Sequence, residues 1–100
     1  MRMTNTDDIA EVLGRSGNHS LVQLPGRGFP ALAIQGDSLK CLQDAVRELA
    51  EADAAGDGEE ISYPLREVVE RVAAMVVSFE EMSALANRQL PYFTGPAEGP

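Results

Sequence analysis

Apolar residues recur every three or four positions through the second half of the chain, which is the spacing of amphipathic helices. Between residues 38 and 55 the repeating positions are Leu39, Leu42, Ala45, Val46, Leu49 and Ala52. Between residues 62 and 88 they are Leu65, Val68, Val69, Val72, Val76, Phe79, Met82 and Ala86. Residues at this spacing share one helical face, so the pattern predicts helices over 38–55 and 62–88. A strand over 72–79 is the main alternative, because valine favours strands.

The ends of these two helices carry recognisable signals. Gly56 can adopt the left-handed conformation that ends a helix, and Ser62 is a suitable N-cap for the second helix. Pro64 is expected in the first turn of that helix, where its missing N–H is not needed. The polar residues 57–60 are predicted to form the connecting loop.

The first half of the chain has shorter apolar segments separated by turn residues. Residues 4–14 are predicted to form a short helix with Ile9, Val12 and Leu13 on one face. Its candidate N-caps are Thr4, Asn5 and Thr6. Two apolar runs, 21–24 and 31–34, flank the turn-rich residues 25–28, which predicts a β-hairpin with a loop longer than two residues.

These elements predict an α+β domain. The two helices are joined by a short loop, so they should pack antiparallel, and their shared apolar face should cover one side of the hairpin. Leu90, Tyr92 and Phe93 are expected to dock the chain after the second helix. We predict one domain over residues 1–94 and a disordered tail over 95–100, which contains two prolines and two glycines.

Composition restricts the function. The net charge is −8, from 16 acidic and 8 basic residues, so the basic surface that nucleic-acid binding requires is not expected. An acidic surface can instead steer a basic protein into place. Cys41 is the single cysteine, which excludes an internal disulfide and fits the cytoplasm. Neither a signal peptide nor an apolar run of membrane-spanning length is recognisable, so no membrane association is expected.

One short motif suggests catalysis. Gly36-Asp37-Ser38-Leu39 resembles the GDSL motif of serine hydrolases, whose serine is the nucleophile. The Asp-x-x-His block of that family is missing, and the only histidine, His19, precedes the motif. A serine hydrolase needs a base, an orienting acid and an oxyanion hole. We therefore expect Asp37 or Ser38 to cap the helix that Leu39 begins, and we predict that the chain is not an enzyme.

Two further chemical sites, a thiol nucleophile at Cys41 and a calcium loop in the acidic run, are considered and not predicted. Cys41 and His19 are the residue types of a thiol nucleophile and its base, but Cys41 lies beside an apolar helix face, where a buried thiol is ordinary. The acidic run 48–60 lacks the alternating oxygen ligands of a calcium loop. No metal and no cofactor are therefore predicted.

Two surface features are candidates for partner binding. Arg27 and Phe29 lie in the loop Leu-Pro-Gly-Arg-Gly-Phe-Pro, where an exposed guanidinium and an aromatic ring could anchor a partner, or where the glycines only satisfy turn geometry. The acidic run could be a solvated helix end or an acidic face for a basic partner. Its residues are Glu48, Glu51, Asp53, Asp57, Glu59 and Glu60.

Three motifs resemble an uncharacterised family of small bacterial proteins. They are Leu-Pro-Gly-Arg-x-Phe-Pro at 24–30, Gln-Gly-Asp-Ser-Leu at 35–39 and Leu-Pro-Tyr at 90–92. More loosely, residues 24–50 are similar to HicB-type antitoxins, in which a strand ends at a Gly-Asp-Ser/Thr step before an amphipathic helix. That similarity implies a protein that binds and blocks a small toxin, although the further strands and the DNA-binding segment of HicB-type proteins are missing here.

Together these features predict a non-catalytic protein-binding module. The leading hypothesis is an immunity or antitoxin-type inhibitor of a basic bacterial toxin, and the partner is expected to be another protein. The alternative is a self-associating structural or regulatory module that forms a homodimer through the edge of the β-hairpin.

Overall fold

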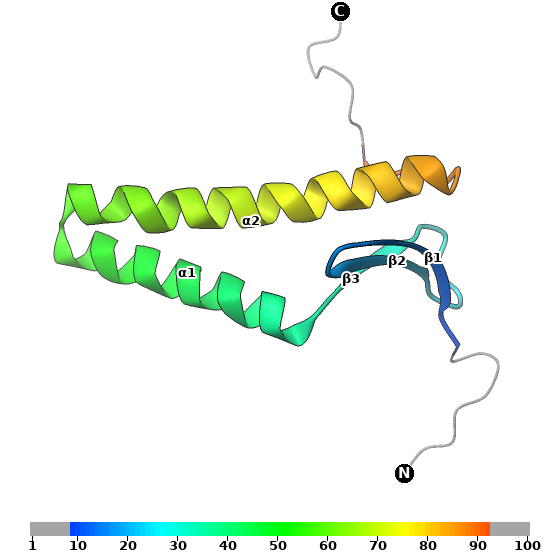
Figure 1. Ribbon diagram of the computed structural model, residues 1–100, viewed down its shortest axis with the longest axis horizontal. Coiled ribbons are helices and arrows are strands. Elements are labelled where there is room, and N and C mark those ends of the chain that lie inside the picture. The colour runs from blue at the N-terminus through cyan, green and yellow to red at the C-terminus, as the bar shows by residue number, and fades with distance from the viewer. Residues whose placement is uncertain (1–8, 93–100) are drawn as a thin grey trace, which may run out of the picture.

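The computed structural model describes residues 9–92 and has a three-stranded antiparallel sheet followed by two long helices (Figure 1). In chain order the elements are β1 (Glu11–Ser16), β2 (His19–Gln23), β3 (Ala31–Ile34), α1 (Gly36–Ala55) and α2 (Gly58–Leu85). The predicted α+β class is confirmed. Residues 95–100, for which disorder was predicted, lie outside the described residues.

The predicted hairpin is formed by β2 and β3, which pair antiparallel. Leu21 stands opposite Leu32 in this pairing, and Leu21 is completely buried while Leu32 is half-buried. Side chains alternate between the two faces of a strand, so the core face is the one that carries Leu21. Pro30 immediately precedes β3, where its missing N–H removes no bond from the ladder.

The predicted N-terminal helix is wrong over the residues that the structure describes. Residues 11–16 form strand β1, which pairs antiparallel with β2 through a tight turn at Gly17 and Asn18. Gly17 has a φ of +59°, a conformation that suits glycine. A helix of this length is marginal in isolation, and pairing with β2 brings half-buried Leu13 against the core. The earlier part of the predicted helix, residues 4–8, lies outside the described range.

The two helices form an antiparallel hairpin, as predicted (Figure 1). Gly56 ends α1 in the left-handed conformation, with φ +73°. The caps of α2 were predicted wrongly: Asp57, not Ser62, caps the helix by accepting hydrogen bonds from the N–H groups of Glu59 and Glu60. The helix therefore begins four residues earlier than predicted, and Pro64 lies in its second turn rather than its first.

The start of α1 also differs from the prediction. The helix begins at Gly36, and the N-cap residue Gln35 makes no side-chain capping bond. Neither Asp37 nor Ser38 is the cap, since both lie inside the first turn, where Asp37 Oδ1 accepts a 2.8 Å hydrogen bond from the Ser38 N–H. The carboxylate still satisfies one of the free N–H groups at the helix start.

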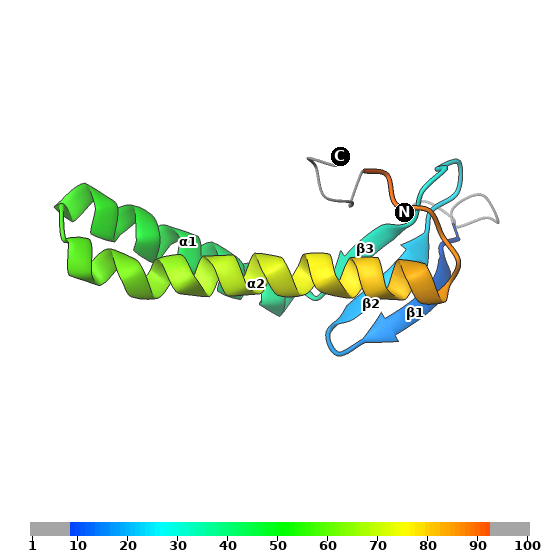
Figure 2. The same cartoon turned by 90° about the horizontal axis from the view of Figure 1, so that it is seen from above.

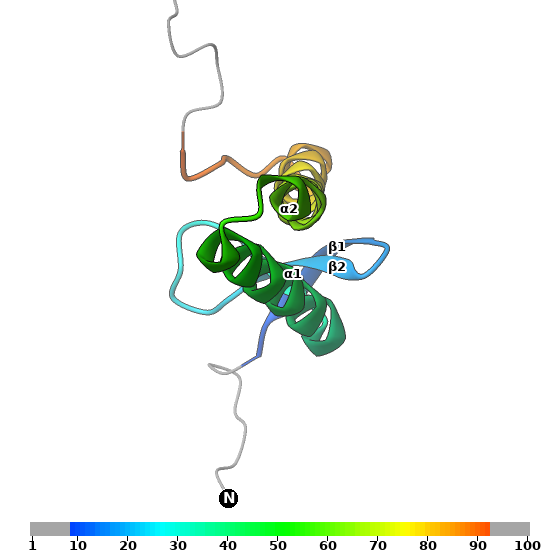
Figure 3. The same cartoon turned by 90° about the vertical axis from the view of Figure 1, so that its left-hand side faces the viewer.

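Helix α2 makes the main helical contacts with the sheet, whereas both helices were expected to cover it. It has 28 residues against 20 in α1, and its C-terminal part extends beyond α1 and lies across the strands (Figure 2). Residues 72–79 are helical, so the strand alternative is excluded. Viewed along the helices, α1 and α2 lie side by side with the strands behind them (Figure 3).

A small core lies between α2 and the sheet. Leu21, Phe79 and Met82 are buried there, and the surrounding half-buried residues are Leu13, Leu32, Ala86 and Leu90. Tyr92 stacks on Phe79 with ring centroids 6.2 Å apart, and its hydroxyl donates a 3.1 Å hydrogen bond to Glu80. The expected docking of the chain after α2 is thus observed for Leu90 and Tyr92, while Phe93 lies outside the described residues. Neither α1 nor α2 is long and apolar enough to cross a membrane.

Candidate functional site

Carboxylates gather at the closed end of the helix hairpin. We call this set the acidic end; it consists of Glu48, Glu51, Asp53, Asp57, Glu59 and Glu60. They come from the last two turns of α1, the connection and the first turn of α2, and all six are exposed. Within residues 9–92, none of the six forms an ion pair. The structure therefore brings the predicted acidic residues to one tip of the helix hairpin.

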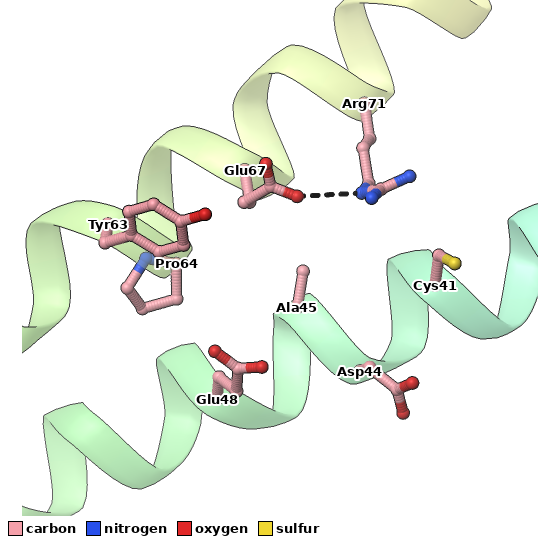
Figure 4. A pocket seen from close by; sticks show the side chains of 8 residues that line it. All are labelled: Cys41, Asp44, Ala45, Glu48, Tyr63, Pro64, Glu67 and Arg71. Carbon is pink, nitrogen blue, oxygen red and sulfur yellow. Dashed lines mark hydrogen bonds and ion pairs between the residues drawn. The ribbon is translucent and has the colours of Figure 1, made fainter.

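Two grooves run along the acidic side of the helix hairpin. The groove nearer the connection has a volume of about 410 Å³, and Glu48, Glu51, Asp57 and Glu60 contribute to its wall. The adjoining groove, of about 220 Å³, is lined farther along the helices by Cys41 and Arg71 (Figure 4). Both grooves are lined by Glu48, Tyr63 and Pro64, and Tyr63 is 70% exposed.

Two carboxylates farther from the closed end, Asp44 and Glu67, are paired with basic side chains. Asp44 accepts from Lys40 at 3.2 Å and from Arg47 at 2.7 Å. The Lys40 hydrogen bond is the main reason why the pKa of the Asp44 carboxyl lies below its ordinary value. Arg71 in turn donates to Glu67 at 3.1 Å, and both side chains come from α2 and line the second groove (Figure 4). Within residues 9–92, the six carboxylates of the acidic end have no such pairing.

The acidic end is an extended surface and not a chelating cluster. Across residues 9–92, no group of three or more His, Cys, Asp or Glu side chains is arranged to hold a metal ion. Carboxylates spread over two helices and a groove can instead face several positive charges of one protein partner.

Arg27 and Phe29 lie at the other end of the molecule. They belong to the β2–β3 connection, beside the sheet, whereas the acidic end is at the opposite tip of the helix hairpin (Figure 1). Both side chains are exposed and line a hollow of about 410 Å³. Gln23 holds this loop by donating a 2.6 Å hydrogen bond to the Arg27 carbonyl. The predicted tip and the predicted acidic face are therefore separate surfaces.

The residues considered for catalysis are only partly brought together. His19 and Ser38 line one groove of about 280 Å³, but the His19 Nδ1 is hydrogen-bonded to Ser78 Oγ at 2.9 Å. Ser78 was not predicted, because nothing in its local sequence marks it. In the described part of the chain no carboxylate hydrogen-bonds His19, as the acid of a catalytic triad would. Cys41 lies on a different groove and is exposed, not buried as expected.

An exposed apolar surface on the helices was not predicted from the sequence. Six side chains that were assigned to the core stripe are 43–57% exposed. We call this set the apolar face; it consists of Leu39, Val46, Leu65, Val69, Val72 and Val76. The sequence does contain a signal for this surface, because the apolar stripe of each helix is wider than the contact between two helices requires.

Comparison with known proteins places the chain in one family. No curated protein and no solved structure matches it significantly. A family model does match, and it covers residues 5–92, which includes the sheet, both helices and the acidic end. The chain thus belongs to the family of unknown function DUF6959.

Proposed function

We propose that this chain is a non-catalytic protein-binding module that binds a basic protein through its acidic end. The observation that carries the proposal is a group of exposed carboxylates at the closed end, without ion pairs among residues 9–92. Four of them, Glu48, Glu51, Asp57 and Glu60, line a groove together with Tyr63 and Pro64. The groove offers a partner side chain both an aromatic contact and negative charge on several sides.

The physical basis is electrostatic steering followed by local contact. The chain has a net charge of −8, and six exposed carboxylates lie at one tip of the helix hairpin, so a basic protein would be attracted and oriented before contact. Tyr63 is largely exposed and has the aromatic character common among residues that contribute strongly to binding. Exposed charges are screened by salt, so the affinity should fall as ionic strength rises.

Within this class, we propose an immunity or antitoxin-type inhibitor of a basic bacterial toxin. The supporting features are the acidic surface, the small size and the similarity of residues 24–50 to HicB-type antitoxins, which is an argument by analogy. The single cysteine fits action in the reducing cytoplasm. Arg27 and Phe29 would then form a second contact, and a partner that uses both surfaces must extend along α2.

A matched pair of charge-reversal variants tests the role of the acidic end. The test variant changes Glu48, Glu51 and Glu60 to Lys, and the control changes the exposed residues Glu11, Glu70 and Glu81 to Lys. Both raise the net charge by the same amount. The tagged wild type first captures its partner from the native bacterium at low salt, and calorimetry then measures the affinity of each variant for that protein.

We expect a basic partner whose affinity falls at least tenfold for the test variant and much less for the control. The affinity of the wild type should also fall between 0.05 and 0.5 M NaCl, as surface electrostatics require. Equal affinities for the two variants, or a captured partner that is acidic, would contradict the proposal.

The alternative, a homodimer through the sheet edge, has less structural support. Edge strand β1 has an irregular register between Val12 and Gly14, and edge strand β3 has four residues preceded by Pro30. Bulges, short strands and proline are features by which proteins discourage edge pairing. A different surface offers a better route to self-association.

A further inference from the structure

The apolar positions of both helices follow the repeat of a helical bundle. Steps of three and four alternate through Leu39, Leu42, Val46 and Leu49 in α1, and through Leu65, Val68, Val72 and Met75 in α2. This is the spacing of the inward positions of coiled coils and four-helix bundles. Four of these residues are half-buried, namely Leu42, Leu49, Val68 and Met75. The other four are exposed, namely Leu39, Val46, Leu65 and Val72. Half of each bundle seam is therefore uncovered.

The uncovered positions lie on the side of the helix hairpin away from the grooves. Successive residues of a helix are about 100° apart, so residues two positions apart point about 160° away from each other. Val46 and Glu48 have this relation in α1, and Val69 and Glu67 have it in α2. Glu48 and Glu67 line a groove, while both valines belong to the apolar face. The helix hairpin thus has one polar side and one apolar side.

We propose that a second copy of this chain covers the apolar face, so that two helix hairpins form a four-helix arrangement. The six side chains together expose roughly 500 Å² of surface, so a twofold pairing would bury about 1,000 Å² in total, the lower bound for a specific interface. The half-buried neighbours in each seam add to this area. The proposal does not rest on the acidic end being a binding site, because none of the six apolar side chains lines either groove.

Charge and symmetry identify the occupant. Each chain has a net charge of −8, so two copies can approach only where charges are few. None of the six residues of the apolar face is charged. The carboxylates Glu48, Glu51 and Glu60 lie on the groove side of the helices. In a twofold dimer the same surface of each copy contacts its counterpart, so the apolar face of one copy would pack on the apolar face of the other. An anionic lipid surface is a poorer match, because interfacial helices normally surround their apolar face with lysine and arginine.

Two valine substitutions on α2 form a matched test. Val72 and Val77 are 44% and 49% exposed, but they lie about 140° apart around the helix. Only Val72 belongs to the apolar face. Val72→Glu introduces a carboxylate into the proposed interface from both protomers, while Val77→Glu adds the same charge outside it. Val69→Glu is a second variant within the face, used if circular dichroism shows that Val72→Glu does not fold.

Sedimentation equilibrium of the full chain at 1–100 µM measures the outcome. We expect the wild type to approach twice its monomer mass of 10.7 kDa. The dimer dissociation constant should rise at least 100-fold for Val72→Glu and less than threefold for Val77→Glu. A wild type that stays monomeric at 100 µM overturns the proposal and leaves the face to another partner. A dimer that both variants weaken equally, or that neither weakens, also overturns it.

Discussion

Leu21 is the residue whose truncation should destabilise the fold most clearly. Its side chain is completely buried between the sheet and α2, against Phe79 and Met82. Leu21→Ala removes three carbon atoms, which corresponds to about 2.4 kcal/mol at 0.8 kcal/mol for each buried methylene. The cavity left behind adds to this loss, so we expect the free energy of unfolding to fall by about 3–5 kcal/mol.

Urea unfolding followed by circular dichroism at a fixed protein concentration measures this loss. A domain of this size has a total stability of about 5–10 kcal/mol, so the urea midpoint should fall by more than 1 M. Leu85→Ala is the matched control, because Leu85 is 88% exposed and should change the stability by less than about 0.5 kcal/mol. If the two variants lose similar stability, or if Leu21→Ala loses less than about 1 kcal/mol, then the core is not where the structure places it.

Three further predictions concern the caps, the docked C-terminal segment and the Asp44 ion pairs. Asp57→Ala should lower the free energy of unfolding by about 1 kcal/mol because Asp57 caps α2, whereas Ser62→Ala should have a much smaller effect. Urea unfolding compares the two variants, and equal losses of stability would contradict the assigned cap. Loss of solvation and, secondly, the hydrogen bond and charge of Glu80 raise the pKa of Tyr92. The contribution of the Tyr92 hydroxyl to folding stability is therefore complete below pH 10 and is lost as the pH rises through the folded pKa. Ultraviolet titration of a Tyr63→Phe background should show this pKa falling toward 10 when Glu80→Gln is added, and an unchanged value would contradict the contact. Lys40→Met should raise the pKa of Asp44 in a carbon-13 NMR titration, because Lys40 stabilises the ionised carboxylate. The contribution of this carboxylate to folding stability is lost as the pH falls below 3.8 and through the folded pKa. An unchanged pKa in the variant would exclude the Lys40–Asp44 hydrogen bond.

The helices were predictable because their apolar spacing is regular over many turns. Gly56 was also identified correctly as the end of α1, since few other residues adopt its conformation without strain. The cap of α2 was misassigned because Asp57 and Ser62 are both good N-cap residues. The choice of Asp57 depends on how short the connection between α1 and α2 is in the folded structure.

The N-terminal strand could not be predicted from local pattern alone. Ile9, Val12 and Leu13 fit one face of a helix, yet β1 forms because the turn at Gly17 and Asn18 lets this segment pair with β2. That pairing depends on residues outside the apparent helix. Tertiary contacts therefore override a short helical pattern whose own stability is marginal.

The acidic end was predictable as a set, but its position was not. The carboxylates are close in sequence, and a tight connection between two helices must bring them to one tip. Their separation from Arg27 and Phe29 follows from the direction in which α1 leaves the sheet (Figure 1), which no local pattern encodes. The apolar face was misread as core because periodicity identifies an apolar side without showing what covers it.

The two proposals give different roles to different parts of the helix hairpin: the apolar face pairs two copies, and the acidic end remains free for a basic partner. The molar mass of the wild type at 50 µM, measured by sedimentation in 0.1 M and in 1 M NaCl, tests this directly. We predict a dimer at both concentrations, and a larger dimer fraction at 1 M, because salt screens the repulsion between two chains of charge −8 without weakening apolar contact. Dissociation at 1 M NaCl would mean that charged groups hold the copies together, and a monomer in both buffers would mean that the apolar side does not pair; either result contradicts the account.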